Sequence, residues 1–108
     1  SRQSGTDEGL FLLAGRGSSA MGYPIDKDCF LVLKGSRIAP DMTSGLPQNY
    51  VEQRKTLLGT GIIQNNVFAE DNVFTSASAA ASIILGRSSN GRREWAKLDG
   101  RTLAQSGH

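Results

Sequence analysis

The residues best suited to chemistry lie between positions 87 and 101, where cations and serines surround an Asn-Gly pair. Five cations and two carboxylates fall in this segment, so it carries a net charge of +3 in a chain whose net charge is +2. Guanidinium groups suit two-point contact with phosphate, and serine hydroxyls also contact nucleic-acid backbones. The candidate nucleic-acid-binding residues are Arg87, Ser88, Ser89, Asn90, Arg92, Arg93 and Lys97. The alternative interpretation is a loop that turns at Asn90-Gly91 and has solvated arginines.

A second basic turn and a helix start offer additional contacts. Lys34 and Arg37 lie in the turn at residues 34–37 and would extend the basic surface if the fold places the two turns side by side. Ser76 and Ser78 form a weak candidate site for an anion, because amides at a helix N-terminus favour negative charge. Capping explains the same serines without any ligand.

Trp95, which follows the basic loop, is predicted to be structural. Tryptophan buries a large area, so we expect its ring to pack on the Ala80/Ile84 side of a helix. The alternative is a platform on which a nucleic-acid base stacks.

No set of residues has the composition of a catalytic or metal-binding site. Cys29 is the single cysteine and His108 the single histidine, so neither an intramolecular disulfide nor a zinc site is available. Cys29 has apolar neighbours and is predicted to be a buried small hydrophobe rather than a nucleophile. Four acidic residues are interpreted as solvated turns rather than metal ligands: Asp26, Asp28, Glu70 and Asp71. We therefore expect no enzymatic activity, no cofactor and no small-molecule substrate.

Length and composition indicate one small domain. A chain of 108 residues with 38% hydrophobic residues and 13 glycines has room for one modest core and many turns. Serines interrupt its longest apolar segment, residues 77–85, which is far shorter than the ~18 residues of a membrane span. We expect a cytoplasmic protein that does not enter membranes. The domain is expected at residues 9–104, after a linker or excision remnant at 1–8 and before a tail at 105–108. The N-terminal segment also suggests a domain cut from a longer protein, with its partner domain on that side.

The elements that must position these residues alternate between strands and helices. Strands are predicted at residues 9–13, 21–25, 29–34, 62–63, 67–68, 73–74 and 94–98, and helices at 50–58 and 77–85. Pro24 assigns the second strand to a sheet edge, since proline cannot donate to the ladder. Gly15-Arg16-Gly17 lacks the third glycine of a dinucleotide-binding loop and is predicted to be a plain turn.

Local signals fix the helix ends and one hairpin. The first helix should bury a stripe made of Tyr50, Val51, Arg54, Leu57 and Leu58. Residues 64–66 predict a hairpin turn, because asparagine tolerates positive φ. Ser76 should cap the start of the second helix, and Gly86 should end it in the left-handed conformation. The fold class is therefore α+β, a single domain in which two short helices pack on one face of a small antiparallel sheet.

Several motifs together resemble a known family. They are Gly22-Tyr23, residues 30–36, the helix end from Leu57-Leu58 to Gly61, and then residues 74–81, 85–91, Trp95 and 99–103. On these marks the chain resembles domain-of-unknown-function family 4357 over about residues 9–103. Ala77 departs from the pattern, because the family often has proline after the capping serine. The C-terminal half is also similar to a module associated with restriction enzymes and adenine methylases.

The resemblance implies a context rather than a mechanism. The family commonly follows a GIY-YIG nuclease-like domain and offers no catalytic residues to carry over. With the basic segment, this favours a non-catalytic accessory module of a DNA-handling protein in a bacterial-type restriction or repair context. Its partners would be nucleic acid, DNA or RNA, and an N-terminally fused domain of the parent protein. The alternative is a structural module that docks on its parent enzyme or on another protein.

Overall fold

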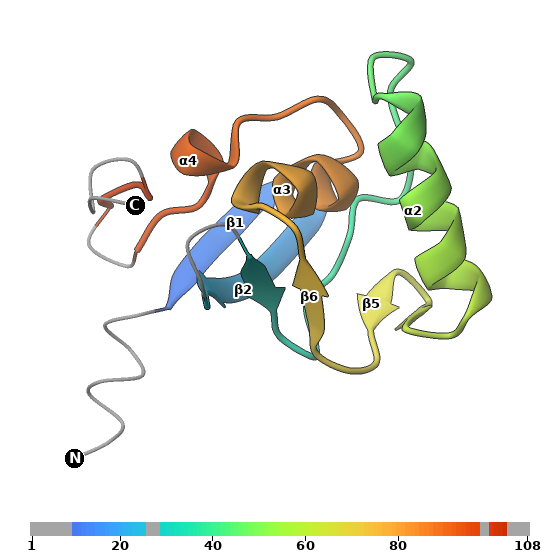
Figure 1. Cartoon of the computed structure of the whole chain (residues 1–108), viewed down its shortest axis with the longest axis horizontal. Helices are drawn as coiled ribbons and strands as arrows, with labels where there is room; N and C mark the ends of the chain where they lie inside the picture. Colours follow the sequence, from blue (N-terminus) through green and yellow to red (C-terminus); the bar gives the residue numbers. More distant parts are fainter. Residues whose placement is uncertain (1–9, 26–28, 98–99, 104–108) are drawn as a thin grey trace.

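One antiparallel sheet with α3 across one face forms the centre of the molecule (Figure 1). The computed structural model describes residues 10–25, 29–97 and 100–103. The sheet has the order β1-β2-β3-β6, with strands at Phe11–Gly15, Ser18–Pro24, Phe30–Val32 and Asn72–Phe74. A separate hairpin is formed by β4 (Ile63–Gln64) and β5 (Val67–Phe68). The predicted α+β class is confirmed.

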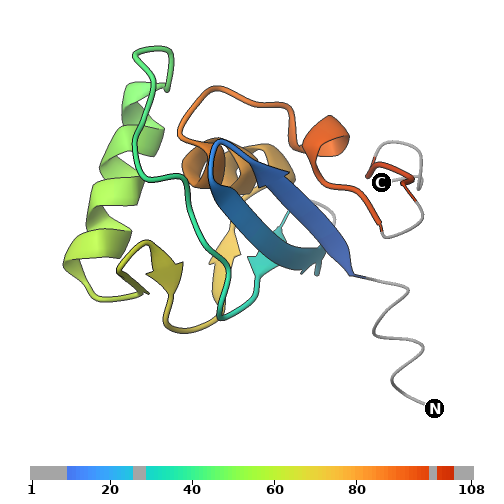
Figure 2. The same cartoon turned by 180° about the vertical axis from the view of Figure 1, so that it is seen from behind.

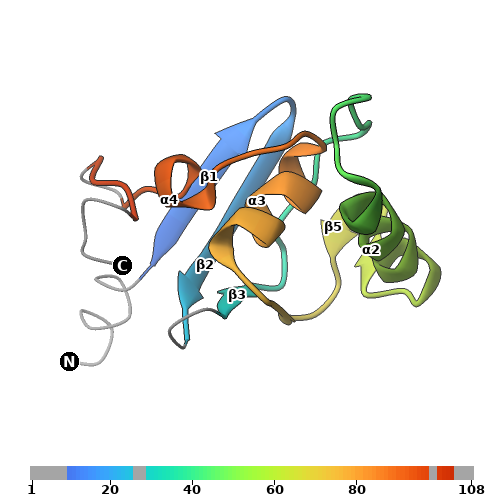
Figure 3. The same ribbon diagram turned by 45° about the horizontal axis from the view of Figure 1, so that its top comes forward.

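The described helices lie on one side of the sheet. They are α2 (Gln48–Gly59), α3 (Ala77–Leu85) and α4 (Gly91–Glu94). In two views α3 lies between α2 and α4 (Figures 1 and 3). Only α3 crosses the sheet directly, whereas α2 packs on α3 and on β4. The opposite face of the sheet carries no helix among the described residues (Figure 2).

The core lies between the sheet and α3. Alternate strand residues point into it, because successive side chains of a strand face opposite sides. Every residue of α3 from Ala79 to Leu85 is buried, as expected for a helix that is apolar on all sides. Besides α3, the core contains Phe11, Leu13, Ala20, Phe30, Val32, Ile38, Leu57, Ile63, Phe68, Phe74, Trp95 and Leu103.

The caps of α3 are those predicted from the sequence. The Oγ of Ser76 accepts a hydrogen bond from the backbone N–H of Ala79 at 2.9 Å. Gly86 takes the left-handed conformation with φ of 73°, and a Cβ there would lie 2.4 Å from the carbonyl oxygen of Asp41. Glycine is therefore required at this position both by its backbone angle and by a close approach.

Distant segments satisfy the last carbonyl groups of α3. The guanidinium of Arg54, which is buried, donates to the carbonyl of Ile83 at 2.8 Å and also to that of Ala39. Arg16, in the turn between β1 and β2, donates to the carbonyl of Leu85 at 2.6 Å. Two backbone donors complete the set: Ala39 to Ile84 at 2.8 Å and Thr43 to Gly86 at 2.7 Å. Cations at a helix C-terminus also interact favourably with the helix dipole.

Burial is the main cause of a lowered pKa at Arg54. Loss of hydration lowers the pKa of its guanidinium, the nearby charge of Arg16 lowers it further, and Asp41 opposes both effects. The sequence predicted that Arg54 belongs to the inner stripe of α2, which is confirmed, since only 3% of its surface is exposed. Leu58 was predicted in the same stripe, but it is 42% exposed, so the buried residues of α2 are Arg54 and Leu57.

The placement of β2 at a sheet edge was wrong. β2 lies between β1 and β3. Pro24 is its last residue and stands opposite Phe30, whereas the pairing of β2 with β1 ends at Gly22. The proline thus lies beyond the reach of β1, so its missing N–H interrupts no ladder on that side.

The two predicted turns are confirmed. Asn65 and Asn66 both have positive φ, 54° and 64°, as the tight turn between β4 and β5 requires. Arg16 and Gly17 connect β1 to β2 in the same way, with φ of 51° and 84°. The acidic turn at residues 26–28 and the expected domain limits near residues 8 and 104 lie outside the described residues.

Candidate nucleic-acid interface

The helix α4 carries the central arginines and is held tightly against the start of α3. The backbone N–H of Gly91 donates to the Oγ of Ser78 at 3.0 Å. A Cβ at residue 91 would lie 2.2 Å from the carbonyl carbon of Ala77, far inside van der Waals contact. Glycine is therefore needed at residue 91 so that the two backbones can touch.

Asn90 and Gly91 begin a helix, so the turn that the alternative, solvated-loop interpretation placed there was wrong. The Oδ1 of Asn90 accepts from the N–H of Arg92 at 3.0 Å, which is a helix N-cap. The strand predicted at residues 94–98 was also wrong. Glu94 ends α4, and Ala96 alone forms isolated bridges, to Leu12 and Thr102. Leu98 lies outside the described residues.

The serines of the basic segment differ in their roles. Ser89 is engaged by the fold, because its N–H donates to the Oγ of Ser82 at 3.0 Å and its Oγ donates to the carbonyl of Arg87 at 2.9 Å. Ser88 is exposed. Of the two hydroxyls, that of Ser88 is the better placed to meet a ligand.

Trp95 is fully buried, as predicted. Its ring centroid lies 4.4 Å from that of Phe30, and its Nε1 donates to the carbonyl of Ala77 at 3.1 Å. Ala80 and Ile84 belong to the same core cluster. A buried ring cannot stack on a base, so Trp95 anchors the segment after α4 instead.

The cations around α4 are solvent-accessible to different degrees. Arg92, Arg93 and Arg101 are exposed. Arg87 forms an ion pair with Glu94, with 3.4 Å between Nη2 and Oε2. The Nζ of Lys97 lies 5.6 Å from the ring centroid of Phe11, a cation–π contact. The name α4 surface is used below for these five cations: Arg87, Arg92, Arg93, Lys97 and Arg101.

The structure does not bring the second basic turn to the α4 surface. The backbone N–H of Lys34 donates to the Oδ1 of Asp71 at 2.7 Å, before β6. Arg37 bridges Ser19 of β2 and Val67 of β5. β5 and α4 lie on opposite sides of α3 (Figures 1 and 3). Lys34 and Arg37 are exposed, but they form a separate group.

The candidate anion site at the start of α3 is occupied by the protein itself. The Oγ of Ser76 caps Ala79, and that of Ser78 accepts from Gly91. The pairing of Ser78 with Gly91 was missed in the sequence. A glycine directly after a capping asparagine was its one local signal, and that signal does not identify the partner.

The residues considered for catalysis remain apart. Cys29 is half-buried. Asp71 accepts the N–H of Lys34, and Asp26 and Asp28 lie outside the described residues. Within the described ranges, no group of three or more His, Cys, Asp or Glu side chains could hold a metal ion. No helix there is long and apolar enough to cross a membrane.

The chain belongs to the family described as domain of unknown function (DUF4357), whose model matches residues 11–106. The match includes the sheet, α3 and the α4 surface, so these features belong to one family domain. Comparisons with curated proteins and with solved structures gave no match.

Proposed function

We propose that this chain is a non-catalytic accessory module of a DNA-handling protein and contacts a nucleic-acid backbone weakly through the α4 surface. The observation that carries the proposal is the presentation of Arg92 and Arg93. Both are exposed on a short helix whose start is fixed by Gly91 and whose end is fixed by the buried Trp95. Cations on a rigid support lose less conformational entropy on binding than cations on a free loop.

The charges of the α4 surface set the expected affinity for nucleic acid. Five cations are accompanied by two carboxylates, Glu94 and Asp99, and Glu94 already pairs with Arg87. Contacts of this kind to phosphate are independent of sequence and give dissociation constants of about 10⁻⁴–10⁻⁶ M. The attachment to a nuclease-like domain rests on the resemblance to proteins that carry such a domain.

A salt series with a matched charge control tests the proposal. Binding of a short fluorescent duplex is measured by anisotropy between about 50 and about 200 mM salt. We expect the double variant Arg92→Ala/Arg93→Ala to weaken binding and to reduce the salt slope by about 2. The control Lys34→Ala/Arg37→Ala removes the same charge from the other side of α3 and should leave the slope unchanged. Absence of binding at low salt, or equal effects of both variants, would contradict the proposal.

The accessory role also predicts that the purified chain does not hydrolyse nucleic acid. The chain has a single histidine, and among the described residues no group of three or more His, Cys, Asp or Glu side chains could hold a metal ion. Incubation with supercoiled plasmid and Mg²⁺ should leave the plasmid intact. Cleavage that copurifies with the chain and is lost in Asp71→Asn would show that the domain is an enzyme.

The uncovered sheet face favours a second candidate, docking on a parent or partner protein. Met21, Ile25 and Val73 are 38%, 47% and 52% exposed, and Met21 and Val73 lie on the face opposite α3. The described strand residues of that face carry no charge: Leu12, Ala14, Ser19, Met21, Tyr23, Leu31 and Val73. Exposed apolar patches mark interaction sites. Met21→Glu should then weaken association with the parent domain at all salt concentrations. Association unchanged by Met21→Glu would exclude this face.

A further inference from the structure

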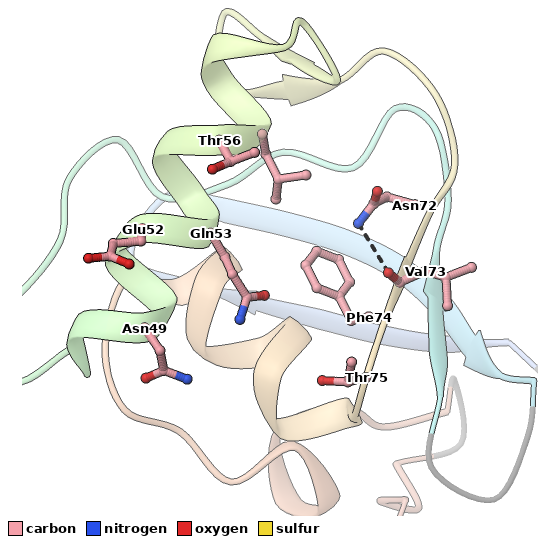
Figure 4. A pocket seen from close by; sticks show the side chains of 9 residues that line it. Asn49, Glu52, Gln53, Thr56, Asn72, Val73, Phe74 and Thr75 are labelled. Atoms are coloured by element: carbon pink, nitrogen blue, oxygen red, sulfur yellow. Dashed lines mark hydrogen bonds between the residues drawn. The ribbon is translucent and has the colours of Figure 1, made fainter.

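β6 is an edge strand, and a groove separates its outer edge from α2 (Figure 4). The groove has a volume of about 400 Å³. Its floor is formed by Leu57 and Phe74, and its walls come from both elements: Asn49, Glu52, Gln53 and Thr56 from α2, and Asn72, Val73 and Thr75 from β6 and its end.

The backbone of Val73 points out of the sheet into this groove. The N–H of Leu33 donates to Met21 of β2, so the N–H and C=O of Leu31, two residues earlier, also face β2. Phe30 and Val32 therefore face β6 and form its ladder with Phe74 and Asn72. Val73, between them, must direct its N–H and C=O away from β3.

These outward groups are poorly satisfied. Among the described residues, no group accepts a hydrogen bond from the N–H of Val73. Its carbonyl accepts only a long hydrogen bond, of 3.4 Å, from Nδ2 of Asn72. An unpaired edge of this kind is a template for another strand.

The stripe of α2 that faces β6 is polar. Asn49, Glu52, Gln53 and Thr56 follow the spacing i, i+3, i+4, i+7, and all four are exposed. A helix that packs directly on a sheet edge would carry apolar residues at this spacing. Instead, Gln53 projects toward the open space beside Phe74 (Figure 4). The stripe thus leaves polar side chains beside β6 in place of an apolar contact, with the amide of Gln53 available as a hydrogen-bonding partner.

We infer that the groove binds an extended peptide segment of a partner protein, which adds to β6 as a fifth strand of the sheet. Backbone groups of the peptide pair with Val73, and its side chains alternate between solvent and the polar wall of α2. The amide of Gln53 offers hydrogen-bond donors and an acceptor but no positive charge, so the groove suits a peptide backbone rather than a phosphate backbone. Pairing of β6 with β6 of a second copy does not fit, because α2 of each copy lies beside the outer edge of its β6.

This inference does not depend on the proposed function. The groove lies between α2 and β6, whereas the α4 surface lies on the other side of α3 (Figure 3). The duplex-binding assay therefore tests only the α4 surface, and the peptide selection described below tests only the groove.

Variants at two positions separate strand addition from other modes of binding. Val73→Pro removes the outward N–H but leaves the ladder to β3, and the exposed side chain contributes little to the core. Val73→Thr is its control, because it changes the side chain and keeps the N–H. Gln53→Arg fills the groove with a longer side chain, and Lys55→Arg changes an exposed residue of α2 that does not line it. Circular dichroism establishes that each variant is folded.

Short random peptides displayed on phage are the probe, selected on the full chain and counter-selected on Val73→Pro. We expect enriched peptides that bind Val73→Pro and Gln53→Arg about tenfold more weakly, since a lost hydrogen bond leaves a peptide carbonyl unpaired. Val73→Thr and Lys55→Arg should bind normally. Hydrogen exchange should slow at the amide of Val73 when a synthetic copy of the peptide is added. No enrichment over Val73→Pro, or protection elsewhere on the molecule, would overturn the inference.

Discussion

At the scale of single residues, Trp95 should dominate stability. Its side chain is fully buried, contacts Phe30 and donates to Ala77. Trp95→Ala should lower the free energy of unfolding by about 3–5 kcal/mol, measured by urea denaturation. Trp95→Phe keeps a ring but loses the Nε1 donor, so it should cost about 1–3 kcal/mol, the penalty of leaving the carbonyl of Ala77 unpaired. An alanine variant as stable as the parent chain would show that the ring is not part of the core.

Arg54 is the second residue whose loss should be costly. Arg54→Met retains the length of the side chain but removes two charge-assisted hydrogen bonds, to Ile83 and Ala39. We expect a loss of about 2–5 kcal/mol in urea denaturation, because two buried carbonyls lose their donor. Lys55→Met, at the next and exposed position, should change stability by no more than about 0.5 kcal/mol. Equal effects of the two substitutions would mean that the end of α3 is satisfied by other donors.

Several of these residues were identifiable from the sequence, and the reason lies in how local each signal is. The Ser76 cap and the Gly86 end of α3 depend on neighbours within a few residues, so the sequence predicted both. Burial of Trp95 followed from side-chain size. The partners of Arg54 and Ser78 lie 29 and 13 residues away, and no local pattern identifies them.

At the scale of elements, the contact between α3 and α4 should depend on Gly91. Gly91→Ala places a Cβ 2.2 Å from the backbone of Ala77, so we expect a loss of about 3 kcal/mol in urea denaturation. Displacement of α4 should also weaken duplex binding. Gly59→Ala is a matched control, because no atom lies within 4 Å of that Cβ, and it should be neutral or slightly stabilising. A stable Gly91→Ala variant would contradict the close packing.

The errors in the predicted elements have physical causes. The alternating residues from Trp95 onward resemble a strand, but burial of Trp95 and the bridges of Ala96 hold this segment without regular pairing. α4 has only 4 residues, too few for a helical repeat to show in the sequence. The groove beside β6 was also not predicted, since its polar stripe on α2 has the composition of an ordinary solvated helix face.

At the scale of the whole molecule, the two proposed binding sites are separated by α3. We expect a selected peptide and a nucleic-acid duplex to bind together, with each dissociation constant changed less than about twofold by saturation with the other. Isothermal titration of the peptide into the chain, with and without duplex, measures this. Full competition would mean that both ligands use one surface.

The end of α3 also has a consequence for the order of folding. Its carbonyls accept from the β1–β2 turn, from residues 39–43 and from α2, with separations of 69 residues for Arg16 and 29 for Arg54. Closing such long loops costs entropy before any contact repays it, so these bonds should form late and after the transition state. Arg54→Met should then accelerate unfolding far more than it slows refolding. On this expectation, the hydrogen bonds at the end of α3 set the unfolding rate, and therefore the lifetime, of the native state.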